Sequence, residues 1–338
     1  MRPPLIRSRT RPCRALCAAA CVATLSFSFA LHAEPSDLPP EVGYNYGEIE
    51  TPRIAAMGGA LRGFSSSLDA LFVNPANMAS SRVYHIGVTV QIWPEANRQS
   101  YGAGAVDSIV SSTHLAGGFG GTWTLQDPDG VDRQAADLRF ALAFPFSEQF
   151  FLGAGGRFLW LQQDGLGPLG PSLASGGLED EQIVRGFALD AGATLRPSEN
   201  FGISVVGNNL NNPGHSFQPT TFGGAIGYGS DFITVEGDVL GDFTTWDETT
   251  LRAMVGFEVV LAETYPLRAG YRYDEGAATH SLSLGAGYVD RALAAEVAVR
   301  REIIGDRVAE GNAATAIVLG FRYHLESTGL TASPEDTF

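Results

Sequence analysis

Histidine, cysteine and acidic side chains would carry most enzymatic or metal chemistry in this chain, and their spacing favours neither kind of site. Five histidines follow residue 33 and lie on five separate segments: His85, His114, His215, His280 and His324. No pair has the spacing of a metal site, and no Gly-x-Ser-x-Gly turn presents a nucleophile. The stretches GAGAVD and GAGG lack the strand–helix–strand unit of a nucleotide loop. The sequence therefore predicts no enzyme, no catalytic residue and no cofactor.

One acidic stretch, DPDGVD, deserves comparison with a cation site. Asp127, Asp129 and Asp132 offer oxygen atoms of the type that divalent cations prefer. Their spacing is not that of a complete calcium loop. A solvated turn is the better interpretation, and no metal is predicted.

The first 33 residues have the pattern of a secretory signal peptide. Five arginines precede an apolar stretch at residues 15–31, and Ala33 offers a cleavage site. A short membrane anchor or a lipid attached to Cys21 is the alternative, but the flanks favour removal. All three cysteines lie within this leader, so the mature chain is expected to contain no thiol.

The charge of the mature chain excludes nucleic acid as a partner. Removal of the leader takes five of the 22 basic residues and none of the 37 acidic ones, leaving 17 against 37 and a net charge near −20. No later stretch reaches the roughly 20 apolar residues of a membrane helix.

From residue 83 onward, apolar and polar residues alternate in segments of about ten. In residues 137–146, Leu138, Phe140 and Leu142 oppose Asp137 and Arg139. This alternation is typical of a transmembrane β-barrel with a lipid-facing exterior and a wet interior. Fourteen such segments are predicted: 83–93, 100–107, 113–125, 136–146, 150–162, 182–196, 201–209, 219–229, 232–240, 249–260, 265–273, 279–289, 292–302 and 314–325.

The number of segments and their links favour a barrel of the outer membrane of a Gram-negative cell. Fourteen is even, and long links alternate with short ones, as extracellular loops alternate with periplasmic turns. A secreted β-sandwich is the alternative. It needs no aromatic girdle, yet the strand ends carry Trp93, Trp123, Trp160, Tyr228, Tyr271, Tyr273, Tyr288 and Tyr323.

The expected organisation is a signal peptide at 1–33, an N-terminal extension and plug at 34–82, an all-β barrel at 83–325 and a disordered periplasmic tail at 326–338. A barrel of this size leaves a lumen that its own side chains cannot fill. Residues 56–79 are rich in glycine, form a short helical turn at 68–73 and stop at Asn74-Pro75, so they are predicted to plug that lumen. A helix packed beneath the barrel is the alternative.

Strand parity also predicts which charges face the lumen. Buried charges persist when paired, so their expected role is a ladder of ion pairs that fastens the plug. An anion-binding site at Arg268 and Arg272 is the sharper alternative. The predicted luminal charges are Arg139, Arg157, Arg252, Arg268, Arg272, Arg300, Arg322, Asp137, Asp190, Glu236, Asp238, Glu258 and Glu296.

The plug stretch resembles the N-terminal signature of the FadL-type outer-membrane channels, a superfamily that includes the PorV-like proteins of secretion systems. The matching positions are Gly58, Gly59 and Ala60, then Asp69 and Ala70, then Asn74, Pro75 and Ala76. This resemblance implies a fourteen-stranded barrel occluded by an N-terminal hatch, with passage of apolar molecules. It also implies a lateral opening in the third strand, where Gly117, Gly118, Gly120 and Gly121 lie; room for the plug is the alternative role of these glycines.

The resemblance implies passive uptake of small hydrophobic compounds of the fatty-acid or hydrocarbon type. The expected partners are outer-membrane lipid and a small apolar ligand. The leucines of loop 164–181 suggest a small apolar funnel for such a ligand, but a loop that simply covers the barrel is the better interpretation. The chain is short for a fatty-acid channel. This favours as an alternative a PorV-like accessory barrel that binds a secreted or periplasmic protein.

Overall fold

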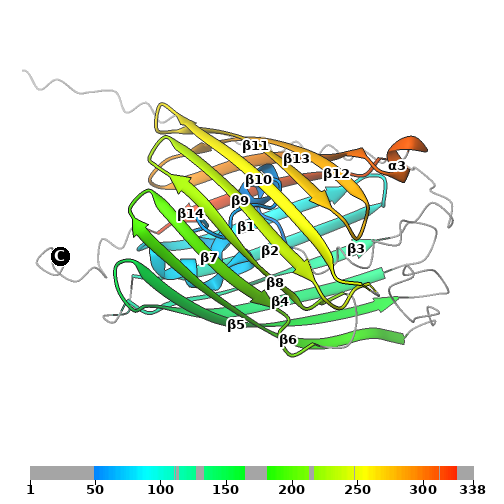
Figure 1. The fold of residues 1–338 in the computed structure, drawn as a ribbon, viewed down its shortest axis with the longest axis horizontal. Coiled ribbons are helices and arrows are strands. Elements are labelled where there is room, and N and C mark those ends of the chain that lie inside the picture. Colours follow the sequence, from blue (N-terminus) through cyan, green and yellow to red (C-terminus); the bar gives the residue numbers. More distant parts are fainter. Residues whose placement is uncertain are drawn as a thin grey trace, which may run out of the picture. The chain divides into compact units, whose positions relative to one another are not determined.

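Fourteen antiparallel strands close on themselves, and each pairs with its neighbours in the sequence until β14 returns to β1 (Figure 1). The structure, a computed structural model, describes residues 49–109, 111, 114–126, 133–163, 181–212, 217–246, 248–311 and 313–325. The predicted leader, the acidic stretch at 127–132, most of loop 164–181, His215 and the tail at 326–338 lie outside these residues. The predicted fold class, a fourteen-stranded barrel, is confirmed.

The observed strand ends differ from the predicted ones by at most three residues. The strands are β1 Tyr84–Trp93, β2 Arg98–Asp107, β3 Ala116–Gln126, β4 Arg133–Pro145, β5 Phe150–Gln163, β6 Glu181–Ser198, β7 Phe201–Asn208, β8 Thr221–Gly229, β9 Ile233–Asp242, β10 Thr250–Leu261, β11 Tyr265–Asp274, β12 Thr279–Val289, β13 Leu293–Ile304 and β14 Thr315–His324. A short helix, α3 (Asp306–Ala309), lies between β13 and β14.

The strands alternate between a buried inner face and an exposed apolar outer face. In β4, Leu138, Phe140 and Leu142 are 56, 55 and 57% exposed, whereas Asp137 and Arg139 on the other face are 2 and 8% exposed. Large apolar side chains exposed to this extent would be unfavourable in water and are stable against lipid. The barrel therefore has the surface of a protein that crosses a bilayer.

The aromatic residues predicted for a girdle lie on this outer face, with one exception. Trp123 and Trp160 stack on neighbouring strands with ring centroids 5.6 Å apart. Trp93 instead shares the inward side of β1 with Gln91, and the Arg98 guanidinium lies 3.8 Å from its ring centroid. The prediction for Trp93 was wrong because a luminal arginine at the start of β2 offers it a cation–π partner.

The two ends of the barrel differ in their connections. Strands β4–β5, β6–β7, β8–β9, β10–β11 and β12–β13 are joined by two to four residues, and this end, which also holds the start of β1 and the end of β14, is termed the short-turn end. The opposite end is termed the long-loop end. Three links depart from the predicted asymmetry: β1–β2 and β11–β12, at the long-loop end, are joined by only four residues each, and β2–β3, at the short-turn end, is joined by eight.

Among the described residues, no helix has both the length and the apolar character required to cross a membrane.

Candidate functional site: the plugged lumen

The segment before β1, residues 49–80, lies inside the barrel and is termed the plug segment (Figure 1). It contains α1 (Pro52–Ala56), α2 (Ser67–Val73) and a 3-10 helix, η4 (Pro75–Ser80). Helix α1 contacts β11 to β14, α2 contacts β1 to β4, and η4 contacts β3 to β6. The three short helices thus touch most of the wall.

Local sequence explains where each short helix begins and ends. Thr51 precedes Pro52 and accepts a hydrogen bond from the Ile54 amide at 3.3 Å, which caps α1. Asn74 ends α2 and caps η4, because its Oδ1 accepts the Ala76 amide at 3.2 Å. Pro75 lacks an amide hydrogen and starts η4 at the position that proline favours.

The Gly58-Gly59 pair forms the turn that follows α1. Both residues have positive φ, at 70° and 90°, where a side chain is strained. A Cβ on Gly58 would also lie 2.8 Å from the backbone of Tyr271. Ala60, which comes next, is fully buried against Val206 and Leu240.

Glycines of the wall form a belt around the plug segment. Eleven of the fourteen strands contribute at least one glycine whose absent Cβ would touch a plug residue: Gly87, Gly104, Gly118, Gly120, Gly153, Gly192, Gly202, Gly227, Gly229, Gly256, Gly270, Gly285 and Gly320. We term this set the glycine belt. Because these positions have no side chain, the plug backbone lies directly against the wall backbone, as at Gly270 beside Met57 and Gly58.

The remaining signature residues occupy buried positions in the plug segment. Asp69 and Ala70 are fully buried, and Asp69 accepts a hydrogen bond from the Thr51 hydroxyl at 2.5 Å. The Asn74 amide donates to the Arg62 carbonyl at 2.7 Å and to Thr194 Oγ1 at 3.0 Å. Pro75 and Ala76 lie against Gly153 of β5. Asn74 therefore joins two parts of the plug segment to the wall.

Six charges, four of them buried and two (Arg53 and Arg322) with side chains 14% exposed, form a closed ring of ion pairs toward the short-turn end, termed the ionic ring. In order around the ring they are Arg53, Glu258, Arg268, Glu296, Arg322 and Asp69. Two members belong to the plug segment, and the other four belong to β10, β11, β13 and β14. Three cations and three anions alternate, so the ring balances its own charge.

The contacts of Glu258 in the ionic ring have the short distances of strong, charge-assisted hydrogen bonds, and the contacts of Asp69 with its two arginines are longer. Arg53 donates to both oxygens of Glu258, at 2.7 and 3.1 Å, and Arg268 Nε donates to Glu258 at 2.5 Å. Asp69 lies 3.4 Å from Arg322 and 3.8 Å from Arg53. Burial by itself would lower the pKa of the Arg53 guanidinium, but Glu258 and Asp69 outweigh it and raise that pKa. Arg53 therefore stays charged.

Two carboxylates of β9 hold the plug backbone on another side. Asp238 Oδ2 accepts the amides of Leu61 and Arg62, both at 3.2 Å, and pairs with the Arg62 side chain at 2.9 Å. Glu236 accepts the next two amides, those of Gly63 at 2.5 Å and Phe64 at 2.9 Å. Four consecutive backbone donors of the plug segment are thus satisfied by neighbouring inward positions of one strand.

A third network fixes the start of the plug segment toward the long-loop end. Glu50 pairs with Arg300 and, at 3.7 Å, with Arg272, while Asp274 pairs with Arg252 at 2.9 Å and Arg272 at 3.5 Å. Burial by itself would raise the pKa of the Glu50 carboxyl. Arg300 and Arg272 outweigh that effect and hold the pKa below its usual value.

Eleven of the predicted luminal charges form ion pairs, whereas Asp190 and Glu236 accept backbone amides. Arg268 and Arg272 do not form one site. Arg268 belongs to the ionic ring and Arg272 to the Glu50 network, and each contacts carboxylates. Arg139 and Arg157 share Asp137, at 3.3 and 2.6 Å, and Asp190 accepts the Asn209 amide at 2.8 Å. An anion site made of Arg268 and Arg272 is not what the structure contains.

The glycines of β3 do not form an opening in the wall. β3 pairs continuously with β2 and β4 from Gly117 to Gln126, with no shift in register. Gly118 and Gly120 face inward against Met78 and Leu71 of the plug segment. Gly117 and Gly121 face outward beside Leu142 and Leu138. The predicted lateral opening is therefore wrong for this structure, and two of the four glycines make room for the plug instead.

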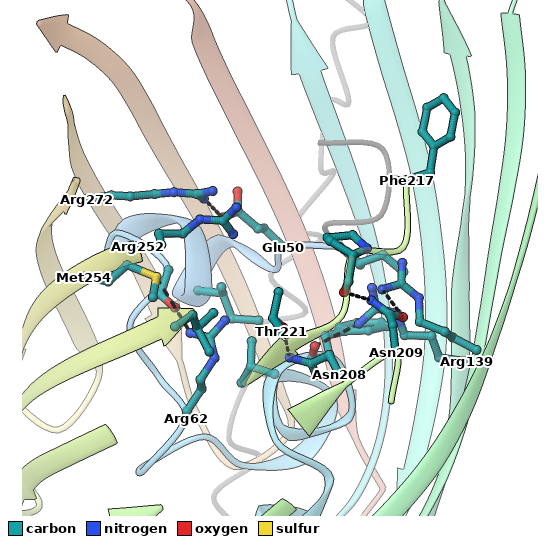
Figure 2. Close-up of a pocket in the computed structure, with 18 residues that line it drawn as sticks. Glu50, Arg62, Arg139, Asn208, Asn209, Phe217, Thr221, Arg252, Met254 and Arg272 are labelled. Carbon is teal, nitrogen blue, oxygen red and sulfur yellow. Dashed lines mark hydrogen bonds and ion pairs between the residues drawn. The ribbon is translucent and has the colours of Figure 1, made fainter. Parts of the chain in front are cut away.

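Among the described residues, two cavities beside the plug segment are larger than a third, which has a volume of about 10 Å³. The loop-side cavity has a volume of about 80 Å³ and is lined by plug residues such as Ile54 and Phe72 and by wall arginines (Figure 2). The turn-side cavity has a volume of about 250 Å³ and is lined by four members of the ionic ring, Arg53, Glu258, Arg268 and Arg322, and by His85 and His324. About 150 Å³ of dry space accommodates benzene. The loop-side cavity is too small for such a ligand unless the plug segment moves.

Histidines of the described chain do not create a metal centre. No group of three or more His, Cys, Asp or Glu side chains that could hold a metal ion exists among the described residues. His85 and His324 stack across the β1–β14 seam with centroids 4.0 Å apart, and His85 Nδ1 lies 2.6 Å from Ser67 Oγ. These two histidines therefore join the plug segment to the seam.

Sequence reasoning missed five charged residues that fasten the plug segment: Glu50, Arg53, Arg62, Arg196 and Asp274. The alternation of apolar and polar residues along strands predicts the orientation of wall residues only. It therefore gives no information on Glu50, Arg53 and Arg62, which precede β1. Each inward charge of the wall needs a partner of opposite charge, and this need was the signal that could have pointed to charged residues of the plug segment. Asp274 is the last residue of β11 and lay one position beyond the predicted strand.

Comparisons with known proteins agree with this architecture. No protein-family model and no curated protein matches the sequence. Solved structures do match. The toluene transporter TbuX of Ralstonia pickettii has a TM-score of 0.59 over 82% of this chain and 99% of TbuX, at 14% identity. The toluene transporter TodX of Pseudomonas putida has a TM-score of 0.58 over 82% of this chain and 98% of TodX, at 12% identity.

A FadL homologue of Pseudomonas aeruginosa matches to the same extent, with a TM-score of 0.58 over 82% of this chain and 99% of the homologue, at 14% identity. Identities this low speak for the fold alone. The match spans nearly the whole of each relative, and it agrees with the Gly-Gly-Ala and Asn-Pro-Ala signature that precedes β1. The chain therefore has the fold of the FadL-type channels.

Proposed function

We propose that the protein is an outer-membrane channel for passive uptake of small hydrophobic compounds, and that the plug segment is its gate. The observation that carries this proposal is a plug of residues 49–80 inside a barrel whose fold matches toluene transporters. The apolar exterior supports a place in a bilayer. The predicted signal peptide and the barrel together support the outer membrane of a Gram-negative cell.

Passage through this barrel requires the plug segment to rearrange. The loop-side cavity, at about 80 Å³, lies on one side of the plug and the turn-side cavity on the other. The ionic ring, the β9 carboxylates and Glu50 hold the plug at three places. A ligand would have to loosen at least one of these attachments before it crosses. Monoaromatic hydrocarbons, of the class named for TbuX and TodX, are the first compounds to test.

The test is uptake of radiolabelled toluene by a Gram-negative host that expresses the protein, together with conductance of the purified protein in planar bilayers. The native chain is compared with a deletion of residues 56–79 and with Glu258→Gln, which breaks the ionic ring. Glu263→Gln is the matched control because Glu263 is exposed and lines the same turn-side cavity. Uptake above the empty host, raised by the first two changes and not by the control, supports the proposal.

A second function, that of a PorV-like accessory barrel, is favoured by the strength of the attachments. A plug fixed by buried ion pairs and by the glycine belt suits a barrel that stays closed while it binds a secreted or periplasmic protein. If neither the deletion nor Glu258→Gln produces uptake or conductance, while both proteins remain folded barrels, the channel proposal is wrong. Specific co-purification of an exported protein would then support the accessory function.

A further inference from the structure

Two kinds of side chain meet in the loop-side cavity. Arg139 and Asn208 of the wall line it with polar groups (Figure 2), and Ile54 and Val73 of the plug segment line it with apolar ones. Sites for small molecules have such linings, with apolar surface for contact and a few polar groups for orientation. An aromatic ring suits both kinds of side chain, because it packs against apolar groups and its face attracts a guanidinium group.

The volume of this cavity is the obstacle to such a ligand. Its 80 Å³ or so is roughly half of the space of about 150 Å³ that accommodates benzene. The missing space is of the size of one side chain. If one ring of the lining moved aside, the cavity would be large enough for a monoaromatic molecule.

Phe72 is the lining residue best placed to move aside. Among the described residues that line the cavity, Phe72 and Phe217 are the aromatic ones. Phe217 is fully buried, whereas Phe72, the next-to-last residue of α2, is partly buried. Phe72 also lines the third cavity, together with Gly155 and Gly156 of β5. It therefore borders unfilled space in two cavities.

Arg139 of β4 connects both the ring and the backbone of Phe72 to the wall. Its guanidinium carbon lies 5.7 Å from the centroid of the Phe72 ring, and its Nη1 donates to the Phe72 carbonyl oxygen at 2.9 Å. Its Nε donates to Asp137 at 3.3 Å, which fixes the arginine to the wall. A cation over an aromatic face contributes about 0.5–2 kcal/mol. Any aromatic ring offers such a face, so a ligand can replace Phe72 in this contact.

We infer that the Phe72 ring occupies an aromatic-binding site of the lumen, and that a monoaromatic ligand binds in the loop-side cavity by displacing this ring from Arg139. The inference rests on the proposed function, since it names the place at which the channel would hold its ligand. Because Arg139 also holds the Phe72 carbonyl, displacement of the ring disturbs the last turn of α2. The ligand thereby loosens one attachment of the plug segment. In a barrel without ligand, the site stays filled by the protein's own side chain.

The test compares the binding of fluorobenzene to the purified full-length protein and its variants, followed by fluorine NMR. All titrations use the same detergent concentration, so partition of the ligand into micelles cancels in the ratio of half-saturation concentrations. Apparent affinity is reduced by the fraction of protein whose site is occupied by Phe72. Phe72→Ala removes this occupant and should therefore bind fluorobenzene at least about tenfold more tightly than the native protein, equivalent to about 1.4 kcal/mol.

Phe64→Ala is the matched control. Phe64 is another partly buried phenylalanine of the plug segment and lies 5.1 Å from the guanidinium carbon of Arg196, but it packs against Gly202 and is not among the described residues that line the loop-side cavity. Its removal adds nothing to that cavity and should leave binding unchanged. Phe72→Trp is the opposite change, and it should weaken binding at least about tenfold because a larger ring fills the space.

Crystals of the native protein soaked in iodobenzene test the position of the ligand. The anomalous signal of iodine should lie in the loop-side cavity, and the Phe72 ring should have left Arg139. Heat-modifiable migration on gels verifies that each variant keeps its barrel, and the soaked native crystals and Phe72→Trp decide the matter if Phe72→Ala does not fold. The inference is overturned if iodobenzene binds while the Phe72 ring stays in place, or if Phe72→Ala gains no more affinity than Phe64→Ala.

Binding to the purified protein and uptake by cells are separate measurements, so failure of this inference differs from failure of the channel. The predicted order of affinities without toluene uptake would support the site and contradict the channel. Toluene uptake with equal affinities in the native protein, Phe72→Ala and Phe72→Trp would contradict the site and support the channel.

Discussion

Breaking the ionic ring at Glu258 should release the plug segment without unfolding the barrel. Glu258 receives three hydrogen bonds from Arg53 and Arg268, whose side chains are 14 and 3% exposed. Glu258→Gln keeps the shape of the side chain and removes its charge. Loss of one partner from a buried ion pair costs about 3–5 kcal/mol.

The lower end of that range applies here, because both arginines keep a second carboxylate. Arg53 lies 3.8 Å from Asp69, and Arg268 lies 2.7 Å from Glu296. A cost of about 3 kcal/mol corresponds to about a hundredfold increase in the population of the released plug. The wall pairing of β10 with β9 and β11 uses backbone groups and should persist.

Amide hydrogen exchange of residues 61–73 measures that population directly. In Glu258→Gln these amides should exchange about a hundredfold faster than in the native protein, while amides of the strands exchange as before. Glu263→Gln, in the neighbouring exposed turn, should leave both sets unchanged. If the two variants exchange alike, the ionic ring does not hold the plug and the electrostatic reasoning fails.

Three further changes probe the other attachments. Gly270→Ala would place a Cβ against the backbone of Met57 and Gly58 and should lower the free energy of unfolding, measured by thermal denaturation, by about 1–3 kcal/mol. Gly237→Ala is the control and should be tolerated, because the nearest atom to the added Cβ is 4.0 Å away. Leu68→Ala removes a side chain that lies against Gly87 and Gly104 and should lower the free energy of unfolding by about 2–5 kcal/mol. Leu284→Ala, on the lipid-facing surface, should lower it by almost nothing. Urea unfolding followed by gel migration distinguishes the two variants. The depressed pKa of Glu50 means that its contribution to plug attachment is complete above its ordinary pKa of 4.5 and is lost as the pH falls through its lower folded-state value. Plug exchange should therefore accelerate in acid, and Glu50→Gln should abolish that part of the pH dependence; an unchanged acid response in Glu50→Gln would contradict the assignment.

The strands could be predicted because alternate residues of each strand face lipid and the lumen, and their apolar or polar character follows these two environments. Leu138, Phe140 and Leu142 against Asp137 and Arg139 reveal an apolar outside and a polar inside without any knowledge of the fold. The same parity identified the inward charges. The helical turn at 68–73 was also legible, because Asn74-Pro75 marks its end, and α2 spans Ser67–Val73.

The partners of those charges could not be predicted, because pairing depends on how the plug sits within the wall. Arg53 meets Glu258, which lies 205 positions later in the chain, and no local pattern encodes such a distance. The glycine belt was equally hidden. Gly117 and Gly118 are neighbours in the sequence, yet one faces lipid and the other faces Met78, so a run of glycine in β3 suggested a weak wall rather than a seat for the plug.

The glycine belt has a consequence for biogenesis. Eleven strands have glycine where the barrel wall meets the plug segment. Without the plug segment, the backbone at these positions would be exposed to water, so the barrel is complete only with the plug segment inside it. The plug segment ends at Ser80 and β1 starts at Tyr84, which tethers it beside the first strands, while α1 contacts the last four. Pairing of β14 with β1 would then close the barrel around the plug segment. Insertion of the barrel into the membrane would therefore be coupled to correct placement of the plug segment.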